Sequence, residues 1–124
     1  MQAAAKVLQS GGSIINISSR AATLAFPGFG VYAGLKSAVD TLTRTAAAEL
    51  GPRGIRVNAV SPGLVETDMS NGPSSEELRA MVKQRTPLEH RAGRPEEIAD
   101  VVAFLASDEA SWVTAQVITL AGGL

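Results

Sequence analysis

The chain has 124 residues, of which 45% are hydrophobic and 19% are charged, and its formal net charge is −1. These values predict one folded domain over residues 1–124, and they argue against a disordered tail or a basic nucleic-acid-binding surface. The apolar runs are too short to span a bilayer and there is no cysteine, so we expect a cytoplasmic protein without membrane contact, disulfides or thiolate metal sites.

The first thirty residues predict a helix, a strand and a loop. Residues 2–9 are alanine-rich and favour a short helix, which the glycines at 11 and 12 end. Residues 13–18 (SIINIS) are mostly β-branched and apolar on both faces, which is typical of a buried parallel strand. Residues 20–30 contain one proline and two glycines and therefore predict a loop.

A long helix and a second strand are predicted next. Apolar residues recur at spacings of three and four from Val31 to Leu50, which is the helical period, and Leu35 is expected on the packing side. The glycines and proline of residues 51–54 end this helix. Residues 55–60 (IRVNAV) predict a strand that the SPG sequence at 61–63 breaks.

The last half of the chain predicts a loop, two helices and a third strand. Residues 64–73 read as a surface loop, and residues 74–85 as a helix with Ser74 at its cap. Pro95 opens another helix, whose buried stripe is formed by Ile98, Val101, Val102 and Leu105. With a strand over 117–120, the order of elements predicts an α/β fold with a parallel sheet of about three strands, whose edge and one face would be exposed.

Two serines, one tyrosine and one lysine form a constellation with chemical potential. Ser18 and Ser19 end a strand, and the carboxyl ends of parallel strands open onto a ligand crevice. Tyr32 and Lys36 are four residues apart and share a helix face, where a nearby cation favours phenolate over phenol. Such a set could exchange a proton with a carbonyl or alcohol while a cofactor carries the hydride. Taken separately, each pair is more commonly structural, as a packed aromatic beside an extended lysine or an ordinary serine turn, and only the combination favours a site.

Four motifs follow one another: GGSIINISS, VYAGLK, ELGPRGIRVNAVSPGLVETDM and RAGRPEEIADVVAFLASDEASWVTAQVITLAGG. Together they resemble the C-terminal half of a short-chain dehydrogenase/reductase, closest to 3-oxoacyl-carrier-protein-reductase-like and glucose-dehydrogenase-like members, over about residues 3–123. The resemblance implies part of a Rossmann-type doubly wound sheet and an NAD(P)-dependent oxidoreductase, with NAD versus NADP open. It also implies a small-molecule carbonyl or alcohol substrate and a homo-oligomer, either a dimer or a tetramer.

The resemblance assigns roles to residues at matching positions. It makes Tyr32 the proton donor and acceptor and Lys36 its activator and the ligand of the nicotinamide ribose. Its usual spacing places the catalytic serine thirteen residues before the tyrosine, at Ser19 rather than Ser18. The loop after the second strand would lie along the nicotinamide, and the cofactor-binding residues implied there are Pro62, Gly63, Val65 and Thr67.

The chain also departs from the family pattern. Leu35 stands where a small residue is usual, Ala115 where a glycine is frequent, and Ala121 where an aspartate is common. Residues 64–86 match the lid over the substrate, and its apolar members Leu64, Met69 and Met81 suggest a partly apolar pocket.

The family's glycine-rich pyrophosphate turn has no match in these residues. We therefore expect the N-terminal nucleotide-binding half to be absent and to be needed for activity. The alternative hypothesis is a noncatalytic module that associates with related subunits or with a complementary half.

Overall fold

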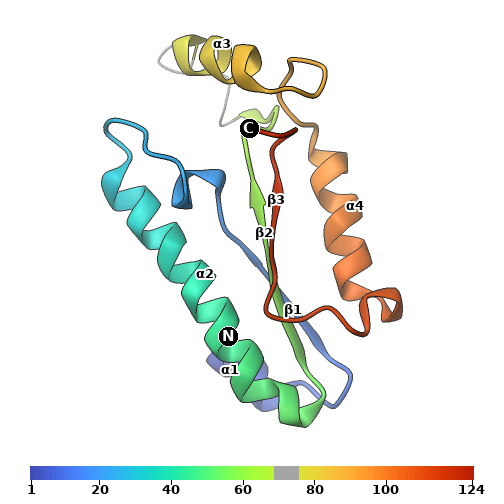
Figure 1. The fold of residues 1–124 in the computed structure, drawn as a ribbon. Helices are drawn as coiled ribbons and strands as arrows, with labels where there is room; N and C mark the ends of the chain where they lie inside the picture. Colours follow the sequence, from blue (N-terminus) through green and yellow to red (C-terminus); the bar gives the residue numbers. More distant parts are fainter. Residues whose placement is uncertain (69–75) are drawn as a thin grey trace.

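The computed structural model describes residues 1–68 and 76–124 (Figure 1). Its sheet has three strands in the order β1-β2-β3, and both neighbouring pairs are parallel. Their carboxyl ends therefore meet at one edge, where β2 leads into the loop that follows it and β3 leads to the end of the chain. The strands are β1 (Ser13–Ile17), β2 (Arg56–Pro62) and β3 (Val117–Leu120).

Helices lie on both faces of this sheet (Figure 1). Helix α2 (Gly30–Leu50) packs against one face over β2, and α4 (Pro95–Ala106) packs against the other over β1 and β2. Helix α1 (Gln2–Val7) precedes β1, and α3 (Glu76–Arg85) lies beyond the carboxyl ends of β2 and β3. This arrangement confirms the predicted α/β fold of Rossmann type.

The hydrophobic core lies between the sheet and α4. Val60 of β2 and Leu105 of α4 are fully buried there, and Ile98, Val101 and Val102 pack around them. The predicted stripe therefore faces the core, with Leu105 buried and the other three residues partly buried, and Pro95 is confirmed as the first residue of the helix. Proline suits that position because the first helical N–H has no partner within the helix.

The predicted packing side of α2 is wrong. Leu35 is 64% exposed, and Val31 and Leu42 are exposed with it. The face that packs on the sheet instead carries small and polar side chains, and its fully covered members are Asp40, Thr43 and Ala47.

Polar residues on the covered sheet face account for this reversal. The side-chain amide of Asn16 on β1 donates to Thr43 Oγ1 at 2.9 Å, and the buried Ser18 hydroxyl donates to the Lys36 carbonyl at 3.3 Å. A polar face needs hydrogen-bonding partners from the helix above it, so the apolar stripe of α2 turns outward. Periodicity identifies an amphipathic helix but does not say which stripe meets the sheet when both have possible partners.

Two strand predictions also need correction. Strand β1 was expected to be buried, but most of its residues are half-buried and Ile17 is 52% exposed, because in the described part of the chain β1 pairs on one side only, with β2. Strand β2 runs through Pro62 instead of breaking at residue 61, since Ser61 and Pro62 still pair with β3. The predicted Ser74 cap lies outside the described residues.

Ala115 occupies an unusual backbone conformation. Its φ is +60°, in the left-handed region that favours glycine, and this is the position where the family resemblance leads us to expect a glycine. The turn is held by the Ala115 N–H, which donates to the Val57 carbonyl at 2.8 Å. The backbone of Ala115 is therefore strained in this turn.

Among the described residues, none of the helices has the length and hydropathy that a bilayer crossing requires. Over the same two ranges, no group of three histidine or acidic side chains is arranged to hold a metal ion.

Candidate active site

Tyr32 and Lys36 lie on one face of the first turns of α2. The Lys36 ammonium is 5.7 Å from the centroid of the Tyr32 ring, and the tyrosine is 44% exposed. Lys36 Nζ also donates to the carbonyl of Ile17, the last residue of β1, at 2.9 Å. The pair is thus fastened to the carboxyl end of a strand, and the predicted same-face arrangement is confirmed.

Two phenylalanines hold the tyrosine ring from its N-terminal side. Phe29 meets the Tyr32 ring edge-on with centroids 6.2 Å apart, and Phe26 meets Phe29 in the same way at 6.1 Å. Edge-to-face pairs of this kind fix ring orientation. Sequence reasoning missed this aromatic row, although three aromatic residues spaced by three in a chain with only 4% aromatic content were a usable signal.

The two serines after β1 have different surroundings. Ser18 is buried and its hydroxyl is used in the bond to α2. Ser19 is partly exposed, and its Oγ accepts the Ala21 N–H at 3.2 Å, capping the short 3-10 helix η1 (Arg20–Ala22). A hydrogen bond of 2.9 Å from Ser37 Oγ to the Ala22 carbonyl holds η1 against α2. Ser19 is therefore the more accessible hydroxyl of the two, and its turn packs on the helix that carries Tyr32.

The segment after β2 leaves the carboxyl edge of the sheet. Pro62 pairs with Leu120, and the Gly63 N–H donates to the Leu120 carbonyl at 2.9 Å. A Cβ at Gly63 would lie 2.8 Å from the Cβ of Ala121, so packing against β3 already requires a glycine here. Val65 forms a parallel bridge with Gly93, and Thr67 follows on the exposed side of the segment.

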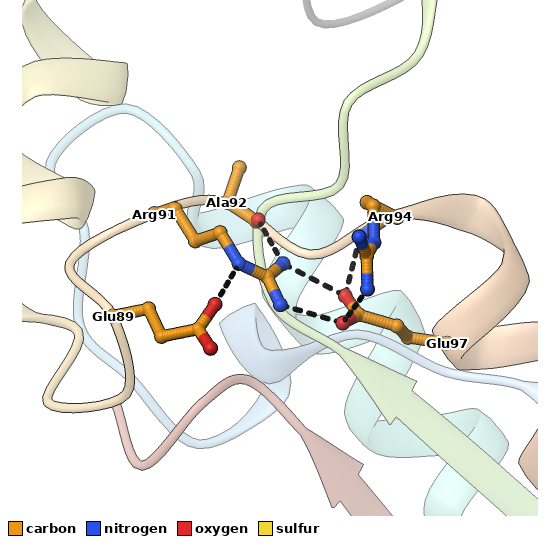
Figure 2. Close-up of polar contacts among 5 residues, drawn as sticks. All are labelled: Glu89, Arg91, Ala92, Arg94 and Glu97. Atoms are coloured by element: carbon orange, nitrogen blue, oxygen red, sulfur yellow. Dashed lines mark hydrogen bonds and ion pairs between the residues drawn. The ribbon is translucent and has the colours of Figure 1, made fainter.

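An ion-pair network stands next to this segment (Figure 2). Arg91 makes two parallel hydrogen bonds to Glu97, of 2.6 and 2.9 Å, and a third of 2.6 Å to Glu89. Arg94 bonds the same Glu97 carboxylate through its side chain at 3.0 Å and through its backbone N–H at 2.8 Å. We call these four residues the Arg91 network.

The hydrogen bonds of the Arg91 network favour the charged forms of both Arg91 and Glu97. Hydrogen bonds from the Arg91 side chain and from the Arg94 backbone N–H lower the pKa of Glu97 to about 2. The same contacts, first with Glu97 and then with Glu89, raise the pKa of Arg91 above its ordinary value. Sequence reasoning used Arg91 and Glu97 only as part of a family motif and assigned no contact between them, although an arginine six residues before the first-turn glutamate of a helix was visible.

A cavity of about 290 Å³ lies between α3, the Arg91–Glu97 pair, the carboxyl end of β3 and the segment after β2. Of the residues predicted for the apolar lid, Leu64 lines this cavity, Met81 is not part of the lining and Met69 lies outside the described residues. The other apolar lining residues include Val82, Leu88, Ile98 and Leu120, and the polar ones include Thr86, Arg91, Glu97 and Thr119.

Comparison with known proteins identifies the family. The sequence profile described as enoyl-(acyl carrier protein) reductase matches residues 1–124. This chain belongs to the short-chain dehydrogenase/reductase family. An uncharacterized oxidoreductase of Methylorubrum extorquens is 50% identical to it over 99% of the chain and 50% of the relative. A 3-oxoacyl-[acyl-carrier-protein] reductase of Thermotoga maritima is 48% identical over 95% of the chain and 47% of the relative.

Solved structures of short-chain dehydrogenases/reductases share the fold. A dehydrogenase/reductase from Sinorhizobium meliloti superposes with a TM-score of 0.88 at 39% identity, covering 98% of this chain and 48% of that one. A 3-oxoacyl-[acyl-carrier protein] reductase from Brucella melitensis with bound NAD gives a TM-score of 0.79 at 42% identity, covering 91% of this chain and 40% of that one. The chain spans about half the length of the curated relatives named above.

Proposed function

We propose that this chain contributes the proton-transfer half of an NAD(P)-dependent oxidoreductase site. The reaction would move a hydride between nicotinamide and a small-molecule carbonyl or alcohol. The observation that carries the proposal is the Lys36 ammonium beside the exposed Tyr32 ring at the carboxyl end of β1. Ser19 on the adjoining turn supplies the third side chain.

The donors of this site suit the nicotinamide half of a dinucleotide. An ammonium has three N–H bonds, and the hydrogen bond to Ile17 uses one of those on Lys36, so others can reach the hydroxyls of a ribose. The segment from Pro62 to Thr67 offers backbone groups beside the same edge of the sheet. That the Brucella melitensis relative holds NAD supports the choice of cofactor class, while the preference between NAD and NADP stays open.

Each side chain has a defined task in this proposal. The Tyr32 hydroxyl gives its proton to the substrate oxygen during reduction and takes it back during oxidation. The Lys36 ammonium stabilises the negative charge left on the phenolic oxygen and binds the ribose hydroxyls. The Ser19 hydroxyl hydrogen-bonds the substrate oxygen and so orients the carbonyl. The nicotinamide, when bound, supplies or accepts the hydride.

We further propose that catalysis needs a pyrophosphate-binding turn in addition to these residues. Short-chain dehydrogenase/reductase resemblance implies a glycine-rich strand–turn–helix for this purpose, and residues 1–124 contain none. A separate segment or chain would supply it. The lack of cysteine in these residues fits a reducing compartment, and we propose the cytoplasm.

The test is a screen of NADH and NADPH oxidation against a panel of carbonyl compounds, using the protein as its gene encodes it together with the segment or chain that supplies the pyrophosphate-binding turn. We expect one cofactor and at least one carbonyl to give turnover, and Tyr32→Phe to remove it. If neither cofactor is oxidised with any carbonyl, the proposed activity is wrong.

Exposed apolar residues favour a second candidate function, association with a partner subunit. Val31, Leu35 and Leu42 form an exposed stripe along α2. Large apolar side chains gathered on one surface mark interaction sites. We propose that a second copy of this protein covers them, giving a dimer or a tetramer.

Light scattering tests this association. Leu35→Glu should lower the oligomer mass, and Thr41→Glu, an equal charge on an exposed position of the same helix outside the stripe, should not. An assembled protein without reductase activity would favour the noncatalytic alternative. Equal masses for both variants would refute assembly through this stripe.

A further inference from the structure

The turn before α4 is bent in a way that needs support. Glu89 and His90 both have positive φ values, 56° and 47°, in consecutive non-glycine residues. Such conformations are unfavourable for L residues and persist where their surroundings hold them. Two hydrogen bonds of the Arg91 side chain stabilise this turn. Nε donates to Glu89 at 2.6 Å, and Nη1 donates to the Ala92 carbonyl at 2.9 Å.

Glu97 anchors this turn to the helix that follows. It lies in the first turn of α4, and its carboxylate receives the bidentate Arg91 guanidinium together with the Arg94 backbone N–H (Figure 2). Bidentate arginine–carboxylate pairs fix geometry as well as adding attraction. Both partners are about two-thirds covered, with 30% of the Arg91 side chain and 35% of the Glu97 side chain exposed. The backbone of residues 91–94 therefore has its position set from one rigid helix.

Gly93 joins the turn before α4 to the segment after β2. Its N–H donates to the Leu64 carbonyl at 2.9 Å, and its carbonyl accepts the Glu66 N–H at 2.9 Å. Val65 lies between these two bonds, in a parallel bridge with Gly93. On one side Val65 is held by the end of β2, and on the other by a residue two positions from Arg91.

We infer that Arg91 is a positioning residue for the candidate nicotinamide segment. Through Glu97 and Gly93 it fixes the backbone of residues 64–66 at the place where Val65 meets the nicotinamide. This inference rests on the proposed function. Arg91 touches neither cofactor nor substrate in it, so its loss should weaken the nicotinamide end of the binding site and spare the adenosine end.

The variants that test the inference are Arg91→Lys, Glu97→Gln and the matched control Glu96→Gln. Arg91→Lys keeps the charge but loses the two parallel hydrogen bonds. Glu96 lies beside Glu97 in the first turn of α4 but is exposed, so Glu96→Gln removes the same charge from the same helix end without touching the network. All are made in the protein as its gene encodes it, and all are assayed with the segment or chain that supplies the pyrophosphate-binding turn.

Two measurements separate positioning from general damage. The first is the Kd of the reduced dinucleotide against the Kd of its ADP-ribose portion, which lacks nicotinamide. Arg91→Lys and Glu97→Gln should weaken dinucleotide binding roughly tenfold, within the range of couplings through packed elements, and leave the ADP-ribose Kd unchanged. The second is hydrogen exchange without ligand, in which the amides of Glu66 and Gly93 should exchange faster in both variants and not in Glu96→Gln.

The outcomes separate a failure of this inference from a failure of the proposed function on which it rests. If the unmodified protein binds the dinucleotide and the variants bind it equally well, Arg91 does not position the segment and the proposed function stands. Equal weakening of dinucleotide and ADP-ribose also overturns the inference, because it indicates a general structural defect. If the unmodified protein binds no nicotinamide dinucleotide, the proposed function and the inference fall together.

Discussion

Replacing Ala115 with glycine should stabilise the protein. Alanine at a φ of +60° is strained by roughly 1–2 kcal/mol, because Cβ approaches the following carbonyl oxygen. Glycine relieves that strain, but it adds conformational freedom to the unfolded chain, which costs about 0.4–1 kcal/mol. The N–H to Val57 bond that holds the turn involves only backbone atoms and is retained. The net gain in the free energy of unfolding should be about 0.8 kcal/mol, the difference between the midpoints of these two ranges.

Urea unfolding of the protein as its gene encodes it, followed by circular dichroism, measures this gain. The midpoint should rise with an unchanged m value, and the melting temperature should rise by about 2–5 °C. The matched control is Ala99→Gly on the exposed face of α4, where the backbone is helical and the same substitution should cost about 1 kcal/mol. If Ala115→Gly destabilises the protein as Ala99→Gly does, the left-handed conformation of Ala115 is not a source of strain.

Three further outcomes follow from the site and its charges. Tyr32→Phe should lower kcat by about 10²–10⁴ with the dinucleotide Kd within about twofold, and a variant with wild-type kcat would remove the hydroxyl from proton transfer. Lys36→Ala should both lower kcat and weaken dinucleotide binding, since one ammonium serves the phenol and the ribose; an effect on neither in steady-state kinetics and calorimetry refutes the pairing. The pKa of Glu97 is lowered in the folded state to about 2 from 4.5, so its stabilising contribution is complete above pH 4.5 and lost as the pH falls toward 2. Unfolding curves across that window should therefore show a shallower loss of stability for Glu97→Gln than for the unmodified protein or Glu96→Gln.

The sequence was sufficient for the elements whose pattern has one interpretation. The apolar stripe from Ile98 to Leu105 packs on the core, and the β-branched run at 117–120 is the third strand with the predicted bounds. The spacing of Tyr32 and Lys36 determined their common face, because helical geometry alone decides it. Local rules and periodicity therefore account for most of the fold and for the central pair of the site.

The features that the sequence did not predict depend on contacts between residues far apart in the chain. The outward stripe of α2 depends on the polar side chains that β1 and the residue after it present to the helix, and Asn16 and Ser18 are far from their partners Thr43 and Lys36 in the chain. The Arg91 network likewise gains its importance from Gly93 meeting the segment after β2, about thirty residues earlier in the sequence. Neither contact has a local period, so neither could be found by reading windows of the chain.

The pair of serines after β1 shows how the fold and the site share one short segment. Neighbouring residues of an extended chain point in opposite directions, so two adjacent hydroxyls cannot do the same work. The buried Ser18 hydroxyl donates to the Lys36 carbonyl, and the Lys36 ammonium donates to the Ile17 carbonyl. Two hydrogen bonds at the same lysine therefore join the strand end to the helix. Those bonds leave Ser19 on the accessible side, at the start of a turn that α2 also holds. In the proposed mechanism, the distance between the serine and tyrosine hydroxyls therefore depends on groups that never touch the substrate.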